Sequence, residues 1–333
     1  MQMALEAGDV APTSESSADP ARTMQCMEVW GGNEAADAAV RMPGLDVWIY
    51  SRPYRDDASG GDVHYVSRCG TGRIARLLVA DVSGHGREVS DVAVSLRNLM
   101  RKFVNFLDQS RFVESLNREF TGTSEGGNFA TAVVGTYWAP TQYLVTCNAG
   151  HPRPFHYRAR TGTWELLKHA DAGPDGGPAN LPLGVVEPTR YEPLGMRLER
   201  GDIVLIYTDS LTEARAPDGS FLGEEGLLAL LNRIDASRPE LFIPRLLARI
   251  AEFSDGAPPA DDATLLLLRA NGDTAPRMSF REAANAAWLF LGLVVSRLTG
   301  GSTPIPWPEL RVANIGGAIF PRLSLRWGAT KSV

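Results

Sequence analysis

Four acidic motifs, each beside a strand-like apolar run, constrain the fold of this chain more than any other feature of the sequence. The most informative is DVSGHG at residues 81–86, which follows an apolar run at residues 76–80 and precedes a helix-like stretch at residues 88–106. A carboxylate at the end of a strand, followed by glycines that let the backbone approach a ligand, suits a bound cation or phosphate. By itself the hexapeptide is equally typical of a strand-to-helix turn capped by Asp and Ser.

Three further motifs repeat this arrangement and favour a cation site over a simple capped turn. Asp62 ends the run SGGD, Asp209 follows the run LIYT, and the pair Asp261 and Asp262 precedes TLLLL at residues 264–268. Carboxylates held together repel one another unless cations neutralise them. A set of hard oxygen ligands without His or Cys favours Mg²⁺ or Mn²⁺. The sequence therefore predicts a site for divalent cations.

In this order, the motifs resemble those of the PPM/PP2C-type metal-dependent protein serine/threonine phosphatases, and more narrowly their bacterial branch, typified by SpoIIE and RsbU. The resemblance covers residues 45–270, and no single match is decisive. Seven matches follow the family's order: GGD (60–62), DVSGHG (81–86), NFATA (128–132), NAGHP (148–152), LPLGV (181–185), the segment 201–214 and DDATLLLLR (261–269).

The resemblance implies an enzyme that hydrolyses phosphoserine or phosphothreonine in a partner protein, such as a phosphorylated anti-sigma-factor antagonist in partner switching. Its cofactors would be two ions, Mn²⁺ or Mg²⁺, which activate a water molecule so that no protein nucleophile is needed. Asp81 would bridge the two ions, and the carbonyl of Val82 would add a ligand. Asp62 would serve the second ion, and Asp209 and Asp261 the first.

Five further residues are expected next to these ligands: Gly61, His64, His85, Ser210 and Asp262. Asp262 is expected to accept hydrogen bonds nearby, while Asp261 takes the ligand position. His64 either contacts the phosphate or donates a proton to the leaving group, or it points outward from a strand. His85 either orients a water molecule or packs the turn.

Ser210 departs from the family, which usually has glycine after the Asp of this motif. If the backbone there needs a positive φ, serine costs on the order of 1 kcal/mol and displaces the neighbouring Asp209. Together with the altered residues that follow GGD, this departure keeps a second function open. In that alternative, the chain is a catalytically weak PP2C-like module that binds a phosphoprotein without hydrolysing it.

The apolar runs predict an α+β fold, because many antiparallel-type strands are segregated from a few helices. The resemblance narrows this to a PP2C-like layered β-sandwich flanked by helices (α-β-β-α). Strand-like stretches lie at residues 45–52, 64–68, 73–80, 129–138, 143–148, 154–157, 164–168, 203–207 and 264–269, and helix-like stretches at residues 88–106, 111–120, 222–234 and 239–253.

Three regions are expected along the chain. Residues 1–44 form a disordered tail and a short N-terminal extension with a helix at residues 33–41, and residues 45–270 form the phosphatase domain. Residues 271–333 form a C-terminal extension with one apolar helix, which packs on the catalytic domain, forms a homodimer or partner interface, or attaches to a membrane surface. The apolar run of that helix is shorter than the roughly 20 residues that a membrane-spanning helix needs.

Composition argues against several classes of protein. The net charge of -6, without a basic stripe, argues against a nucleic-acid partner. The three cysteines, Cys26, Cys69 and Cys147, have no CxxC spacing, which fits a reducing compartment better than a disulfide framework. The N-terminal residues have no basic region followed by an apolar core, so no targeting segment is expected. We therefore expect the protein in the cytoplasm.

Overall fold

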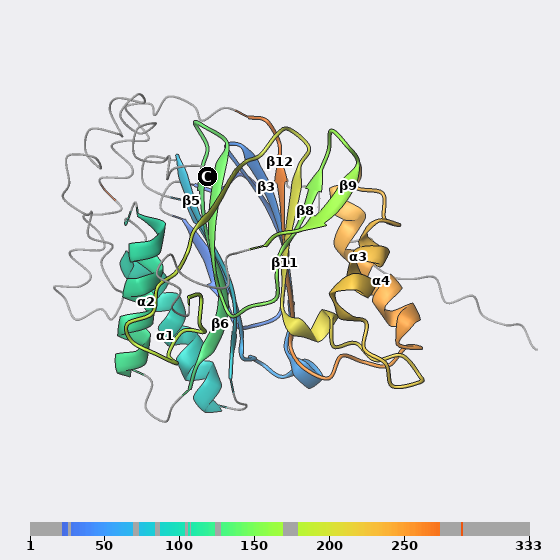
Figure 1. Cartoon of the computed structure of the whole chain (residues 1–333), viewed down its shortest axis with the longest axis horizontal. Coiled ribbons are helices and arrows are strands. Elements are labelled where there is room, and N and C mark those ends of the chain that lie inside the picture. The colour runs from blue at the N-terminus through green and yellow to red at the C-terminus, as the bar shows by residue number, and fades with distance from the viewer. Residues whose placement is uncertain are drawn as a thin grey trace, which may run out of the picture.

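Two antiparallel sheets packed face to face form the centre of the molecule, and a pair of helices covers the outer face of each sheet (Figure 1). This arrangement confirms the expected α+β sandwich with the layer order α-β-β-α. The structure is a computed structural model. It describes residues 22–25, 28–68, 73–83, 87–103, 106, 108–123, 128–168, 179–273 and 288.

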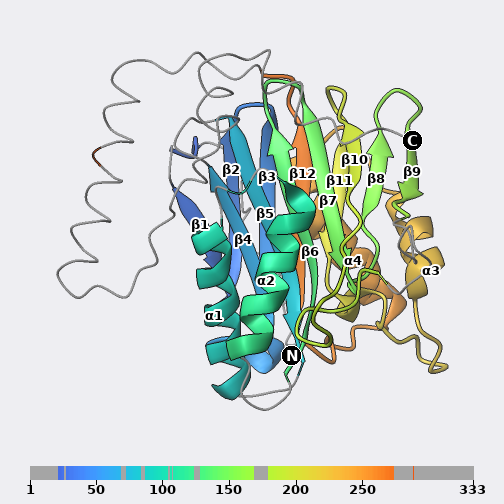
Figure 2. The same ribbon diagram turned by 60° about the vertical axis from the view of Figure 1, so that its left-hand side comes forward.

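The first sheet packs against helices α1 and α2, which lie across its outer face in Figure 2. The helices are α1 (Arg87–Phe103) and α2 (Gln109–Thr123). In the described part of the chain the sheet has six strands, in the order β1 (Val29–Gly32), β4 (Asp62–Arg68), β5 (Ile74–Val82), β6 (Ala130–Trp138), β7 (Tyr143–Ala149) and β10 (Leu194–Arg197).

The second sheet packs against α3 (Gly223–Leu231) and α4 (Phe242–Phe253) on its outer face. Three short 3₁₀ turns are η1 (Tyr54–Asp56), η2 (Asp209–Leu211) and η3 (Pro239–Leu241). The described strands of this sheet lie in the order β2 (Ala36–Met42), β3 (Leu45–Arg52), β12 (Ala263–Ala270), β11 (Ile203–Tyr207), β8 (Phe155–Arg158) and β9 (Thr163–Leu166).

Strand β5 contributes alternate side chains to two different hydrophobic cores. Leu78 and Ala80 pack with α1 and α2, whereas Leu77 and Val79 pack in the core between the two sheets. Successive side chains of a strand point to opposite faces, so a strand covered on both faces is apolar at every position. This explains the unbroken apolar run in the sequence.

The expected helix at residues 33–41 is wrong, because the structure has strand β2 there, hydrogen-bonded to β3. Its alanine-rich sequence favours a helix by intrinsic propensity. However, Val40 and Met42 are buried in the core between the sheets, and this packing outweighs the propensity. Strands β1 and β10 are also absent from the sequence-based expectations, and both pair with the first sheet.

Several expectations concern residues outside the described part of the chain. These are the C-terminal apolar helix with its homodimer interface, most of the N-terminal tail, and His85. They stay predictions. Among the residues that the structure describes, no helix has the length and apolar character needed to cross a membrane.

The strand directions bring all the acidic motifs to one end of the sandwich, the lower end in Figure 1. Strand β4 begins at Asp62, and Asp81 is the penultimate residue of β5. Strand β11 ends two residues before Asp209, and β12 begins directly after Asp261 and Asp262. We call the part of the molecule that holds these five aspartates the acid end.

Candidate metal centre at the acid end

Two of the predicted ligands lie side by side in the first sheet. Asp62 in β4 is the register partner of Asp81 in β5, and Asp81 in turn is the partner of Thr131 in β6. Directly opposite residues of an antiparallel pair share a face of the sheet, with Cβ atoms roughly 4.5–5.5 Å apart. The register of two consecutive strands therefore places two carboxylates next to each other.

The second sheet supplies the other carboxylates through the ends of β11 and β12. Thr208, directly before Asp209, donates its backbone N–H to the carbonyl of Thr264 at 3.0 Å, which keeps the two strand ends together. The hydroxyl of Thr208 donates to the Asp62 carboxylate at 2.8 Å. This hydrogen bond connects the two sheets directly at the acid end.

Burial and like charges make the carboxylates in the first sheet unusually easy to protonate. Burial, and then the charges of Asp209 and Asp261, raise the pKa of Asp81 to about 7. Burial, and then the charge of Asp81, raise the pKa of Asp62 well above its usual range. Both shifts mean that the negative charges at this end are not balanced by cationic side chains of the described chain.

Asp209 experiences the same effect, and its strongest charged neighbour is a residue that sequence reasoning missed. Burial, and then the charges of Glu213 and Asp261, raise the pKa of Asp209. Glu213 also contributes to the shift of Asp81. Its position four residues after Asp209, in the same motif, was the available signal.

Gly60 and Gly61 let the chain pass close to its neighbours at the acid end. A Cβ atom at Gly60 would collide with the carboxylate of Asp262, and one at Gly61 would lie 3.0 Å from the carbonyl oxygen of Val82. Both glycines are therefore required by close approach of other groups. A side chain at residue 61 would crowd the Val82 carbonyl, where the resemblance implies a ligand.

Asp262 accepts hydrogen bonds from the loop that carries Gly61. Its carboxylate accepts the backbone N–H groups of Tyr54 at 2.6 Å, Gly61 at 2.5 Å and Asp62 at 3.3 Å. Asp261 is exposed, and its carboxylate accepts only the backbone N–H of Asp262 among the described residues, at 2.8 Å. The two neighbours thus have different surroundings, and Asp261 has the more available oxygens.

The donor set at the acid end fits hard divalent cations. It consists of carboxylates and one carbonyl, which are the ligands that Mg²⁺ and Mn²⁺ prefer. The raised pKa values of Asp81 and Asp209 show that these groups lack compensating positive charge. Within the described residues, no group of three or more His, Cys, Asp or Glu side chains is tight enough to hold an ion as it stands. The individual ligand roles therefore stay predictions.

The condition under which Ser210 would be strained is not met. Ser210 lies in the 3₁₀ turn η2, and it is not among the described residues with positive φ. A right-handed turn of this kind accepts any residue, so serine costs no left-handed strain here. The Ser210 hydroxyl is buried and has no hydrogen-bond partner among the described residues.

His64 is buried, so the alternative of an outward-pointing side chain is wrong. Burial, and then the charge of Arg97, lower the pKa of His64 to about 4, which keeps the ring neutral near pH 7. Its Nδ1 atom has no hydrogen-bond partner in the described part of the chain. A contact with phosphate stays a prediction for this residue.

His151 of the NAGHP motif, expected from the sequence to be a hydrogen-bonded turn residue near the site, makes such hydrogen bonds: its backbone N–H donates to Asn148 Oδ1 at 2.7 Å. Its ring Nδ1 lies 2.8 Å from the hydroxyl of Thr131, the register partner of Asp81. The carbonyl of Tyr207, two residues before Asp209, partly opposes the lowering of the ring's pKa to about 3 that burial causes.

The comparisons with known proteins agree with this geometry. The family model described as Stage II sporulation protein E (SpoIIE) matches residues 71–271. Phosphoserine phosphatase RsbU of Bacillus subtilis (strain 168) is 24% identical over 226 residues, which are 68% of this chain and 63% of RsbU. The chain thus spans less than two thirds of the length of this curated relative.

Two solved structures share the fold. The RsbU and RsbW domains of Rv1364c from Mycobacterium tuberculosis have a TM-score of 0.57 and 25% identity, over 79% of this chain and 72% of that one. The PP2C phosphatase domain of SpoIIE from Bacillus subtilis, with a fragment of its regulatory domain, has a TM-score of 0.56 and 14% identity. The match covers 74% of this chain and 64% of that one. Because the family model covers more than half of the chain, this protein belongs to the SpoIIE family.

Proposed function

We propose that this protein is a metal-dependent protein serine/threonine phosphatase that hydrolyses phosphoserine or phosphothreonine in a partner protein. The observation that carries the proposal is the meeting of carboxylates from both sheets at the acid end, where neighbouring charges help to raise the pKa of Asp81 to about 7. Such a group is costly by itself and is stabilised when cations bind. Membership of the SpoIIE family supports the same activity.

The proposed ligand roles follow the positions at the acid end. Asp81 would hold both ions, with the carbonyl of Val82 as a further ligand, while Asp62 would hold one ion and Asp209 and Asp261 would hold the other. Two Mn²⁺ or Mg²⁺ ions bound there would lower the pKa of a water molecule and screen the charge of the phosphoryl group. No protein nucleophile is then required.

Other residues of the chain keep these ligands in position. Thr208 holds the Asp62 carboxylate by a hydrogen bond of 2.8 Å. Asp262 fixes the backbone around Gly61 by accepting its N–H group. His151 contacts the hydroxyl of Thr131, the register partner of Asp81, through a ring that stays neutral. Such supporting contacts restrict the ligand geometry before any cation binds.

The proposed substrate is a phosphorylated partner protein, such as an anti-sigma-factor antagonist in bacterial partner switching. This is supported by the relatives, one of which carries RsbU and RsbW domains in one protein. We also propose a cytoplasmic location. Cys147 supports it, because this cysteine is a buried free thiol whose pKa burial raises, so it is inert rather than part of a disulfide.

The test is hydrolysis of p-nitrophenyl phosphate and of a phosphoserine peptide by the purified full chain. We expect phosphate release with Mn²⁺ or Mg²⁺, and none in excess EDTA. Full activity in EDTA, or a covalent phosphoenzyme trapped by acid quench, would contradict the proposal. Binding of the phosphopeptide without release of phosphate would instead identify the chain as a phosphoprotein-binding module.

A further inference from the structure

A second concentration of charge lies at the opposite end of the sandwich from the candidate metal centre. It is a pocket of about 240 Å³, lined by Arg41, Asp46, Arg200, Arg269 and Asp273 together with two uncharged residues. Strand β12 connects the two ends, since it begins next to the acid end and ends in this pocket. At about 3.3 Å per residue, its eight residues span roughly 25 Å. We call this pocket the arginine pocket.

A row of three charged side chains forms the floor of the arginine pocket. Asp46 in β3 is the register partner of both Arg41 in β2 and Arg269 in β12. Asp46 is buried, and its Oδ1 accepts hydrogen bonds from Arg41 Nε at 3.0 Å and from Asn271 Nδ2 at 3.0 Å. The one carboxylate of the floor is therefore satisfied by Arg41 and Asn271.

Arg269 is left without an acidic partner among the described residues. The Nε atom of its guanidinium group is buried and has no hydrogen-bond acceptor there. A buried donor without an acceptor is unfavourable, more so when it is charged. An acceptor that enters the pocket from outside would therefore stabilise this end of β12.

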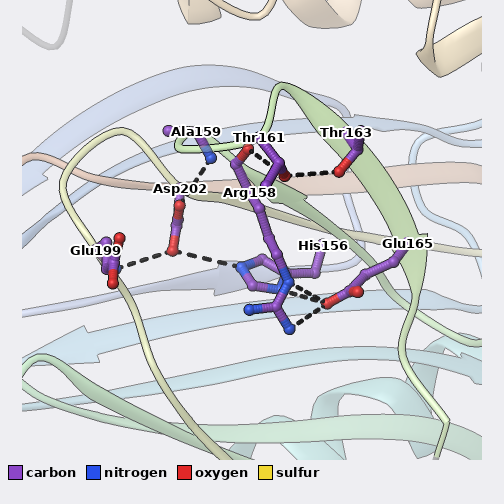
Figure 3. Close-up of polar contacts among 8 residues, drawn as sticks. All are labelled: His156, Arg158, Ala159, Thr161, Thr163, Glu165, Glu199 and Asp202. Carbon is purple, nitrogen blue, oxygen red and sulfur yellow. Dashed lines mark hydrogen bonds and ion pairs between the residues drawn. The ribbon is translucent and has the colours of Figure 1, made fainter.

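Arg200 adds a third guanidinium group from a turn that is firmly held. Figure 3 shows how Asp202 anchors this turn: its carboxylate accepts the backbone N–H groups of Ala159 and of Glu199, each at 2.9 Å. The backbone N–H of Gly201 donates to the carbonyl of Ala270 at 2.8 Å. The turn is thus tied both to the β8–β9 hairpin and to the end of β12.

The side chain of Arg200 lies against the backbone of Gly272. A Cβ atom at Gly272, which has a φ of +79°, would lie only 3.0 Å from Cδ of Arg200. The absence of a side chain there makes room for the methylene groups of the arginine. Arg200 has no acidic partner among the described residues, so its charge is available at the pocket.

We propose that the arginine pocket binds a small anion with one phosphoryl group, either inorganic phosphate or a small phosphomonoester. Three guanidinium groups and two carboxylates line it, which leaves one positive charge in excess. Guanidinium groups bind phosphoryl oxygens with paired hydrogen bonds. The volume is below the roughly 300–1,000 Å³ of pockets for drug-sized ligands, which suits a small anion. This binding goes beyond the proposed hydrolysis, since it uses the other end of the molecule.

The test is calorimetric titration of the full chain with inorganic phosphate and, separately, with glycerol 3-phosphate. Excess EDTA keeps divalent cations from recruiting phosphate to the acid end, so the result does not depend on whether the protein is a phosphatase. We expect Arg200→Gln and Arg269→Gln each to weaken binding at least about tenfold. Asp273→Asn should tighten it, because Asp273 is an exposed carboxylate of the lining.

Two matched variants serve as controls. Arg249→Gln changes an exposed arginine of α4 that pairs with Glu252, and Asp81→Asn changes the acid end; both should bind phosphate as the wild type does. Absence of binding by the wild type, or unchanged affinity in Arg200→Gln, would overturn the proposal. Loss of binding in Asp81→Asn would also overturn it, because phosphate would then lie at the acid end. The tighter of the two anions identifies the kind of ligand.

Discussion

The two ends of the sandwich differ in the groups that surround their aspartate carboxylates. At the acid end, Asp62 and Asp81 lie next to other carboxylates, and burial and the neighbouring charges raise their pKa values. At the other end, Asp46 is as buried as Asp62 but accepts hydrogen bonds from Arg41 and Asn271. The acid end therefore needs cations from outside. The arginine pocket satisfies its own carboxylate and has positive charge left over.

The same strands carry both ends, so the fold separates the charges along its own strand axis. Strand β12 follows the acidic pair Asp261–Asp262 and ends with Arg269 and Ala270. The apolar residues between them fill the two cores on either side of the sheet. Ligands of opposite charge are therefore expected roughly 25 Å apart, too far for appreciable direct interaction at physiological ionic strength.

The largest effect is expected for Asp81→Asn. This change removes the carboxylate that is proposed to bridge two ions, and should lower turnover by roughly 10³-fold, or about 4 kcal/mol in the activation free energy. Asp235→Asn, which changes an exposed carboxylate outside both ends, is the matched control and should keep wild-type turnover. Substantial activity in Asp81→Asn would show that the acid end is not the catalytic centre.

A smaller difference should separate Asp261 from Asp262. Asp261→Asn should lower turnover by roughly 100-fold, because an available ligand oxygen is lost. Asp262→Asn should lower turnover much less, but should lower the free energy of unfolding by about 1–3 kcal/mol, because its carboxylate accepts three backbone N–H groups. Steady-state kinetics and denaturant unfolding of both variants measure this. The reverse order of the kinetic effects would mean that Asp262 is the ligand.

The contribution of His151 to stability should be lost in acid, while protonation of Asp81, whose pKa is raised to about 7, acts in the opposite direction in every variant that keeps Asp81. Burial lowers the pKa of His151 in the folded state to about 3, from 6.5. Its contribution is fully present above pH 6.5 and is lost as the pH falls toward 3. Between pH 8 and pH 5 this amounts to about 2 kcal/mol of unfolding free energy. Between pH 8 and pH 5, the change in unfolding free energy of His151→Gln should therefore differ from that of the wild type by about 2 kcal/mol, in the direction of a smaller loss. Equal losses in urea unfolding would show that His151 does not titrate in this way.

The smallest effect is expected for Ser210→Gly. Because Ser210 does not have a left-handed backbone, glycine only increases the freedom of the unfolded chain and should cost at most about 1 kcal/mol. Affinity for Mn²⁺ should not change. A more stable variant, or tighter Mn²⁺ binding, would restore the idea of a strained ligand loop and with it the argument for a weak binding module.

The sequence predicts strands best where apolar runs end at turn residues. Strands β3 and β11 begin and end where expected. The sequence of β2 predicts a helix because it is rich in alanine, whereas its strand conformation depends on pairing with β3. The acidic ligand candidates were recognisable because each lies next to a strand. The contact of Thr208 with Asp62 was not, because it joins residues 146 positions apart in the chain.

The arginine pocket could not be predicted for the same reason. Arg41, Asp46 and Arg269 form a row only through the register of three strands, two of which are more than 200 residues apart in sequence. No local pattern around Arg269 distinguishes it from an ordinary surface arginine. Strand register, which depends on the whole sheet, decides both the pocket and the pairing of Asp62 with Asp81.

Calorimetric titration of the apo protein with Mn²⁺ tests most directly whether the acid end is a cation site. We predict two ions per chain for the wild type, with fewer ions or at least about tenfold weaker binding in Asp81→Asn. Arg200→Gln, at the other end of the sandwich, should bind Mn²⁺ as the wild type does. Absence of Mn²⁺ binding, or the same stoichiometry and affinity in Asp81→Asn, would contradict the assignment of the acid end as a metal centre.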